Sequence, residues 1–401
     1  MATTNDIVVV EALRTPRGIA KETGALHRVT PMELLAGLLR ELRSRTGVDT
    51  NEVADGVFGC VTQTAEQGGN IGKAACLLAD WSPSVPAVTI NRYCASGLSA
   101  VNLAAQQASN LQGLAVAGGV EMMSRVPMFS DQAPLYTDQA LSRQIGFMPP
   151  PWTSDLVATR HNISREDCDA YAALSQSRAT TARRAGVAKS MVPVRDAQGT
   201  LLLDHDENIR ESSTQEKLAT LRTVYEPGAG GLDDWGLQRE PELGRINHVH
   251  TAGNAPCMAD GASAVLLGTQ EAAARLGLHA RARIVAHADA CVALTQTGAV
   301  DATRMALARA GLAVQDIDLW EVRDSFAAIT LHYIRTLGIP LDRFNVNGSS
   351  IALGHPMGAT GAMLVSCLLD EMERRGLRYG VAALAGASGV ATATVFERIF
   401  N

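Results

Sequence analysis

The two halves of this chain repeat the same order of predicted elements, and this repeat restricts the fold more than any other feature. Residues 34–59 predict an amphipathic helix that ends at Gly47, followed by a polar turn and a strand. Residues 302–322 repeat that order around Gly311. One such pair could arise by chance among α/β proteins, so the argument depends on finding further pairs.

Two further pairs occur in the same order. Residues 86–91 form an apolar predicted strand that leads through a turn into a small-residue helix, and residues 344–372 run from a strand through glycines into another helix. Residues 113–123 and 379–390 contain short apolar runs typical of strands that are covered on both faces. The sequence therefore predicts two related α/β halves whose loops converge, with functional sites between them.

The composition of the sequence changes between these halves, where prolines, charged predicted helices and a Gly/Pro/Asp-rich stretch replace the repeat. This predicts a loop-rich insertion that supplies ligand contacts. The expected domains are an N-terminal half over 1–120, completed by about 250–268, an insertion over 121–249 and a C-terminal half over 269–401.

Composition excludes several classes of function. The 401 residues are 46% hydrophobic and carry a formal net charge of -6, so no broad basic field is available to bind nucleic acid or an anionic membrane. The seven cysteines are scattered, without a CxxC pair or a Cys/His cluster, which argues against a disulfide framework and a metal site. We expect no membrane insertion, and a reducing cytoplasm as the compartment.

Cys94 is the first candidate for chemistry. It stands in NRYCASGLSAVNLAAQQA, between a β-branched run and a predicted helix. At such a junction the helix dipole and free backbone N–H groups favour a thiolate and can bind an oxyanion. Most intracellular cysteines are simply small buried residues, but this context favours Cys94 as a nucleophile.

His355 is the second candidate, in NVNGSSIALGHPMGATGAM. Glycines on both sides permit tight turns and the close approach of a substrate chain, and a helix is expected beyond Gly361. A single histidine is more often structural than catalytic. Cys94 and His355 nevertheless occupy comparable turns of the two halves, so face-to-face packing of the halves predicts an activated Cys/His pair.

These segments resemble those of the thiolase superfamily. NRYCASGL is similar to the family's nucleophile segment, TAGNAPCMADGASAVLLG to its core-strand segment, and NVNGSSIALGHPMGATG to its histidine segment, with the similarity collinear along the chain. The resemblance implies a layered α/β/α/β/α fold of two related halves plus an inserted loop domain. It also implies that Cys94 accepts an acyl group from a coenzyme A (CoA) thioester and that His355 activates it.

The resemblance implies several partners as well. The acyl-CoA is a substrate and no cofactor is bound permanently, Arg222 matches a family arginine near the nucleotide end of CoA, and members assemble as homodimers or homotetramers. A solvated surface arginine is an equally good interpretation of Arg222. The segments from Pro149 and around residues 230–254 resemble a bacterial subgroup of degradative thiolases that act on bulky or unusual acyl chains.

The chain departs from the family pattern at two motifs. The family's second cysteine, an acid/base in a Cys-x-Gly-Gly-Gly run, is matched by Ala383, with Ala385 at the first glycine. Arg323 stands where the family usually has an asparagine that orients a water, and its guanidinium could grip a carboxylate, stabilise an enolate oxygen, or turn away to pair with Asp324 or Glu321. Cys257 is a less favoured source of the missing thiol.

Three functions follow from these residues. The leading hypothesis is a CoA-dependent acyltransferase with an acyl-Cys94 intermediate, similar to 3-ketoacyl-CoA thiolases, whose second half-reaction is altered. An alternative is a decarboxylative condensing enzyme, or acyl transfer to an acceptor other than carbon. The other alternative is a catalytically silent thiolase-like binding or assembly protein, which Cys94 and His355 argue against.

Overall fold

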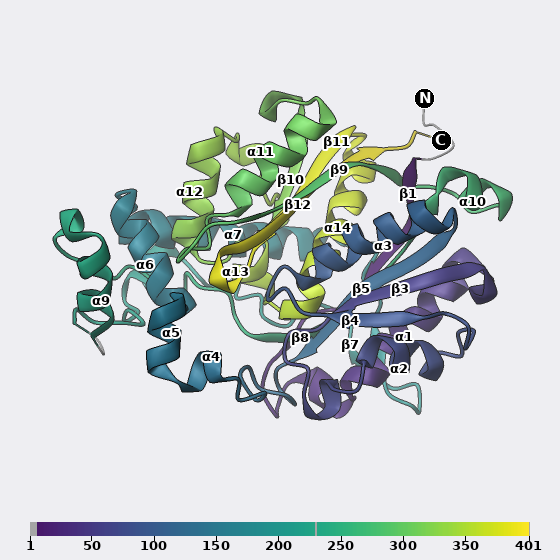
Figure 1. The fold of residues 1–401 in the computed structure, drawn as a ribbon, viewed down its shortest axis with the longest axis horizontal. Coiled ribbons are helices and arrows are strands. Elements are labelled where there is room, and N and C mark those ends of the chain that lie inside the picture. Colours follow the sequence, from purple (N-terminus) through teal and green to yellow (C-terminus); the bar gives the residue numbers. More distant parts are fainter. Residues whose placement is uncertain (1–5, 229–230, 401) are drawn as a thin grey trace.

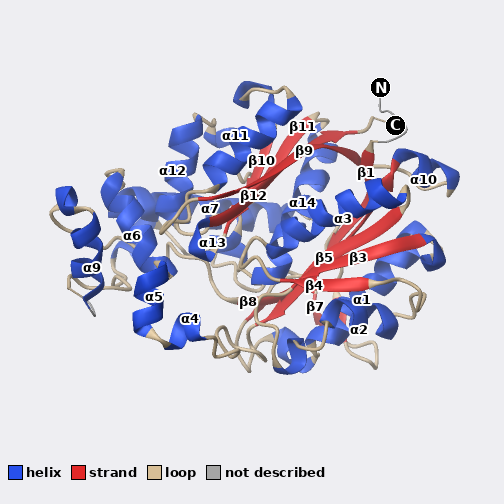
Figure 2. Ribbon diagram, viewed as in Figure 1, coloured by secondary structure: helices blue, strands red, loops and turns tan. Residues whose placement is uncertain are grey.

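The computed structural model describes residues 6–228 and 231–400, and shows two α/β halves that share one mixed sheet (Figures 1 and 2). Part of the predicted Gly/Pro/Asp-rich stretch, residues 229–230, lies outside the described residues. The elements of the first half are β1 (Ile7–Arg14), β2 (Gly18–Ile19), α1 (Pro31–Thr46), β3 (Val53–Gly59), α2 (Ile71–Leu78), β4 (Ala87–Ile90), α3 (Ser96–Leu111), β5 (Leu114–Met122), β8 (Ala259–Thr269) and α10 (Gln270–Arg275).

The second half repeats this order. Its elements are β9 (Ala282–Cys291), α11 (Ala299–Ala310), β10 (Leu319–Val322), α12 (Ala327–Leu337), α13 (Ser350–Leu353), α14 (Met357–Arg375), β11 (Tyr379–Ala385) and β12 (Val390–Arg398). Between the halves lie α4 (Pro134–Thr137), α5 (Gln139–Ile145), α6 (Pro150–Arg160), α7 (Arg165–Ala185), β6 (Val194–Arg195), β7 (Leu201–Leu203), α8 (Gln215–Ala219) and α9 (Leu232–Arg239).

Pairing of the strands confirms the predicted repeat. The sheet runs in the order β10-β11-β12-β9-β1-β8-β5-β3-β4, with β2 paired to β8 at the side. In the first half β3 is parallel to β4 and β5, and β8 is antiparallel to β5. In the second half β10 is parallel to β11, β12 is antiparallel to β11, and a bridge from Trp320 to Phe344 takes the place of the β3–β4 pair.

The layers follow from which helices contact which strands. Helix α3 contacts β3, β5 and β8 as well as β12, and helix α14 contacts β1, β5 and β8 as well as β10 and β11. These two helices therefore lie between the two parts of the sheet, as Figure 1 shows. Helices α1 and α11 cover the outer faces, which confirms the predicted α/β/α/β/α layering.

Capping residues explain why the paired helices begin and end where they do. Thr30 and Glu33 form a capping box before α1, which has proline at its first position. Helices α1 and α11 end at Gly47 and Gly311, both left-handed, as the sequence predicted. Helix α14 begins at Met357, so the expected start beyond Gly361 is wrong. Gly361 lies inside the helix, near its N-terminal end.

No helix of residues 6–228 and 231–400 is both long enough and apolar enough to cross a membrane. The apolar run of residues 379–390, predicted as a strand, contains β11, which pairs antiparallel with β12. The insertion projects to one side of the two halves, where α4, α5, α6 and α9 are seen at the left of Figure 1. The exact domain boundaries stay a prediction.

Candidate active site

Cys94 lies in a tight turn immediately before α3. Tyr93, the preceding residue, has a φ of 47°, a left-handed conformation that is rare for a large side chain. The Ser96 hydroxyl holds the turn, since it donates to the Tyr93 carbonyl over 2.6 Å and accepts from the Arg92 N–H over 2.8 Å. The predicted position of the thiol at the N-terminal end of a helix is therefore confirmed.

His355 lies in the equivalent turn before α14. Its backbone N–H donates to the Cys257 carbonyl over 2.8 Å, and Gly354 before it has a φ of 97°, which favours glycine. Its ring Nδ1 lies 2.8 Å from the Thr360 hydroxyl oxygen, one turn along the helix. His355 is thus held by hydrogen bonds at both its main chain and its ring.

Backbone contacts between α3 and α14 bring the two turns together. A Cβ atom on Gly361 would lie 2.1 Å from the Leu98 nitrogen, and one on Gly97 would lie 2.8 Å from the Gly358 carbonyl oxygen. Only glycines permit so close a crossing at the N-terminal ends of two helices. The glycines around His355 were expected to admit a substrate chain, but Gly358 and Gly361 instead admit the other helix and its neighbouring strand.

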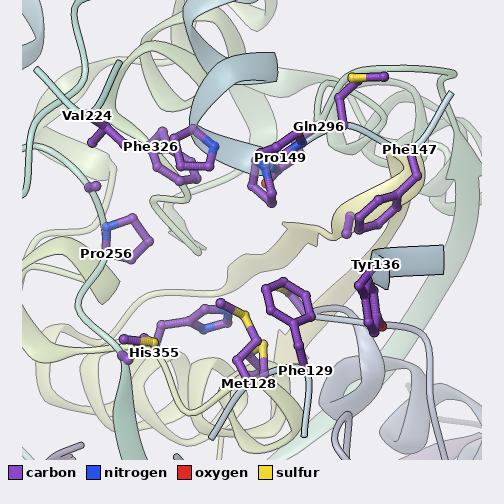
Figure 3. Close-up of a pocket in the computed structure, with 18 of the residues that line it drawn as sticks. Met128, Phe129, Tyr136, Phe147, Pro149, Val224, Pro256, Gln296, Phe326 and His355 are labelled. Carbon is purple, nitrogen blue, oxygen red and sulfur yellow. The ribbon is translucent and has the colours of Figure 1, made fainter. Parts of the chain in front are cut away.

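Cys94 and His355 line one cavity of about 800 Å³. Figure 3 shows the His355 ring at its floor, with Phe129, Tyr136 and Phe147 on one side and Val224, Pro256 and Phe326 on the other. Much of this wall comes from the insertion, while the ligand contacts expected of it stay a prediction. The lining is mainly apolar, and its further members include Met123, Met128, Leu135, Met148, Pro149, Leu232 and Met357.

Arg323 also lines this cavity, and its guanidinium points to the histidine. Its Nη1 lies 2.7 Å from His355 Nε2, while Nη2 donates to the Gln296 side-chain oxygen over 3.1 Å and to the Ser325 hydroxyl. The carboxyl group of the neighbouring Asp324 accepts from Ser175 and from the Ile351 N–H. Arg323 is therefore directed into the site and does not pair with Asp324.

Burial shifts the pKa of several groups around Arg323. Burial and then the charges of Arg323 and Arg17 hold the pKa of His355 well below its usual value, so the imidazole is neutral at neutral pH. Burial raises the pKa of Asp324 to about 7. Burial and the charge of Glu371 raise the pKa of Glu321 to about 8.

Of the remaining residues singled out in the sequence, two line cavities, one is buried in the core and one is exposed. Ala383 is fully buried in a core cluster, and its carbonyl accepts from the Arg323 N–H over 3.0 Å. Ala385, two residues further along the same strand, lines a small cavity with Arg323 and Gln296. Cys257 lines the main cavity. Arg222 is exposed, two positions before Val224 of the cavity wall.

Two polar residues of the site were not anticipated from the sequence. Gln296 comes from the connection between β9 and α11, and no local pattern marks it. Thr360 follows His355 by five residues, which places it one turn into α14 on the side of the imidazole. Knowing where α14 begins would have revealed Thr360, since a helix places residues in its first turn next to its N-cap.

A buried polar network holds the insertion against the cavity. The Asp155 carboxyl lies 2.8 Å from His248 Nδ1 and 2.7 Å from His250 Nδ1, and it accepts from the Val249 N–H over 3.0 Å. The His250 ring packs edge-on against Phe326, a residue of the cavity wall. Asp155 in α6 thus fixes the segment that precedes β8.

Comparison with known proteins agrees with this architecture. Residues 7–233 match the N-terminal domain of thiolase, and residues 278–398 match its C-terminal domain. A 3-ketoacyl-CoA thiolase of Serratia proteamaculans is 40% identical, over 98% of this chain and 100% of its own length. 3-Ketoacyl-CoA thiolases of Pectobacterium carotovorum and Citrobacter koseri are each 38% identical, over 98% of this chain and 99% of theirs. With both domains matched and the repeat, the layers and the paired turns in place, this chain belongs to the thiolase family of acyltransferases.

Proposed function

We propose that this protein transfers acyl groups of CoA thioesters through a thioester on Cys94, with His355 as the group that accepts the thiol proton. The observation that carries the proposal is that both side chains line one apolar cavity from equivalent turns of the two halves. The relatives named 3-ketoacyl-CoA thiolase support a 3-ketoacyl-CoA as the donor.

The first half-reaction requires only groups that this site contains. His355 Nε2 takes the proton of Cys94, and the thiolate attacks the C3 carbonyl of the 3-ketoacyl-CoA. The bond between C2 and C3 then breaks, which leaves the acyl group on sulfur, and the electron pair at C2 takes the proton that His355 received from Cys94.

The second half-reaction lacks a proton carrier at the expected position. Free CoA must lose a proton before it attacks the acyl-enzyme. Ala383 and Ala385 cannot transfer protons, and loss of a positioned acid/base costs about a hundred- to ten-thousandfold in rate. Thiolysis of a simple substrate such as acetoacetyl-CoA should therefore be slow even once Cys94 is acylated.

The remaining assignments concern assembly and CoA. We expect Arg222, exposed next to the cavity wall, to lie near the nucleotide end of CoA, with no permanently bound cofactor. A homodimer or homotetramer in the cytoplasm is the expected form. Size-exclusion chromatography with light scattering measures the assembly, and the affinity of Arg222→Ala for CoA tests the CoA contact.

Intact-protein mass spectrometry after mixing with acyl-CoAs tests the acyl-enzyme. Cys94→Ser should abolish the adduct, and His355→Ala should slow its formation by orders of magnitude. Cys257→Ser is the matched control, because it removes another thiol of the same cavity and should leave the adduct in place. An adduct at full yield in Cys94→Ser refutes the assignment, and no adduct with any donor favours the silent binding or assembly protein.

A further inference from the structure

Arg323 is a buried cation whose hydrogen-bond partners among the described residues are all uncharged, although the Asp324 carboxyl and the Arg17 guanidinium act on the same site through their charges. Its side chain emerges directly after β10, and the residue is 4% exposed. Its partners are the neutral His355 ring, the Gln296 amide and the Ser325 hydroxyl, and its Nε has no hydrogen-bond partner among the described residues. A buried charge without a counter-ion is costly, and proteins usually pair it.

The contact between Arg323 and His355 occupies the lone pair that catalysis needs. The Thr360 hydroxyl donates to the Pro356 carbonyl over 2.9 Å, so its oxygen is free to accept from Nδ1–H of His355. That tautomer leaves the lone pair on Nε2, where Arg323 donates over 2.7 Å. A guanidinium offers only donors and no acceptor to Nε2, so His355 cannot take the Cys94 proton while this contact lasts.

A carboxylate in the cavity would resolve both problems. Arg323 lines the same cavity as Cys94, and the nearest acidic side chain in sequence, Asp324, is already engaged by Ser175 and the Ile351 N–H. Hydrogen bonds between a guanidinium and a carboxylate are roughly twice as strong as those between neutral groups. A ligand carboxylate would therefore draw the guanidinium from His355 Nε2.

We propose that the acyl group carried by this protein bears a carboxylate close to the reacting carbonyl, and that Arg323 binds this carboxylate and so releases His355 to activate Cys94. This inference rests on the function proposed above and names its substrate class. The carboxylate must lie close to the carbonyl, because the guanidinium touches the base itself.

The carboxylate is an anchor and is retained in the product. An ion pair with Arg323 stabilises the carboxylate of the bound substrate, and loss of carbon dioxide would remove the charge that the guanidinium holds. Only interactions that strengthen in the transition state accelerate a step. The same contact that favours binding thus disfavours decarboxylation, which argues against the decarboxylative alternative.

The test compares matched acyl-CoAs in the wild-type protein. Malonyl-, succinyl- and glutaryl-CoA are each set beside the thioester in which an isopropyl group replaces the carboxylate, namely 3-methylbutanoyl-, 4-methylpentanoyl- and 5-methylhexanoyl-CoA. Acylation of Cys94 is followed by rapid quenching and intact mass spectrometry. At least one carboxylated donor should acylate about ten- to a hundredfold faster than its neutral partner.

Substitution of Arg323 should abolish this preference. Arg323→Gln should remove the advantage of the carboxylated donor and should speed acylation by the neutral one, because Nε2 is no longer held by a permanent cation. Arg143→Gln is the matched control, since Arg143 lines the same cavity but is exposed. It should leave the ratio between matched donors unchanged.

A second readout needs neither a variant nor turnover. Added glutarate should raise the rate at which iodoacetamide alkylates Cys94 in the wild-type protein, whereas the uncharged diamide of glutaric acid should not. Matched donors that react at equal rates, together with no effect of glutarate, overturn the carboxylate site even if Cys94 is acylated. A slower neutral donor in Arg323→Gln shows that Arg323 assists acylation itself, as in stabilising the oxyanion of the tetrahedral intermediate, and also overturns it. Absence of any Cys94 adduct refutes the proposed function itself.

Discussion

Gly361→Ala should separate the two catalytic turns without changing any group that reacts. The new Cβ would lie 2.1 Å from the Leu98 nitrogen and 2.8 Å from the Leu98 Cβ, whereas ordinary contacts begin at 3.4 Å. The neighbours are backbone and the stem of a side chain, so they cannot rotate away. Helices α3 and α14 must move apart by more than 1 Å at their N-terminal ends.

This movement should cost far more activity than stability. Overpacking a core typically costs about 1–3 kcal/mol, and alanine recovers up to about 1 kcal/mol of helix propensity. A misplacement of about 1 Å between reacting groups can lower a rate about a hundredfold. Cys94 acylation, measured by quenched mass spectrometry, should therefore fall about a hundredfold while thermal unfolding shifts by a few degrees.

Gly37→Ala is the control for the glycine substitution. Gly37 lies in α1, and a Cβ there meets nothing within 4 Å. The substitution should raise stability by up to about 1 kcal/mol and leave acylation unchanged. A folded Gly361→Ala protein that is acylated at the wild-type rate would refute the view that this helix crossing aligns Cys94 with His355.

Three further predictions concern buried polar groups and the second half-reaction. Because the pKa of Asp324 is raised from 3.8 to about 7, the native state holds its proton more tightly, so the free energy of unfolding should fall as pH rises from about 4 to 7, by on the order of 4 kcal/mol. Denaturant titrations should show a smaller fall in Asp324→Asn, and equal slopes would contradict the assignment. Asp155→Ala should lower the free energy of unfolding by about 3–5 kcal/mol, because it removes the carboxyl partner of the buried His250 and one of the two carboxyl partners of His248; a loss below about 1 kcal/mol in denaturant titrations would show that the network is dispensable. Arg323→Asn combined with Ala385→Cys should raise CoA-dependent cleavage of acetoacetyl-CoA, whereas Arg323→Asn with Ala383→Cys should not, since only residue 385 lines a cavity with residue 323; equal cleavage by the two double variants would refute this distinction.

Most of what could be predicted about the fold followed from the internal repeat of the sequence. Glycines after predicted helices, as at Gly47 and Gly311, mark ends that local backbone conformation alone decides. The same repeat predicted that Cys94 and His355 lie in equivalent turns. The sequence is sufficient for this prediction because it depends only on the order of the elements along the chain.

The features of the fold and site that could not be predicted from the sequence depend on contacts between residues that are far apart along the chain. Whether Gly361 faces a substrate or another helix is decided by how α3 and α14 cross, and no local pattern encodes that angle. The direction of the Arg323 guanidinium likewise depends on the position of Gln296, which a separate connection delivers. The start of α14 at Met357 was missed because Gly358 and Gly361 read as loop residues, although close packing is what requires them.

The position of β1 in the centre of the sheet has a consequence for biosynthesis. Ile7–Arg14 hydrogen-bonds to residues of β8 from Ser263 to Thr269 and to Ala282 and Arg283 of β9. A ribosome adds about 5–20 residues per second, so this nascent strand waits roughly 10 to 50 seconds for its partners to be translated. During that interval its Val and Leu side chains and both of its edges are open to aggregation. A chaperone that binds extended apolar segments would therefore meet β1 before its native neighbours exist.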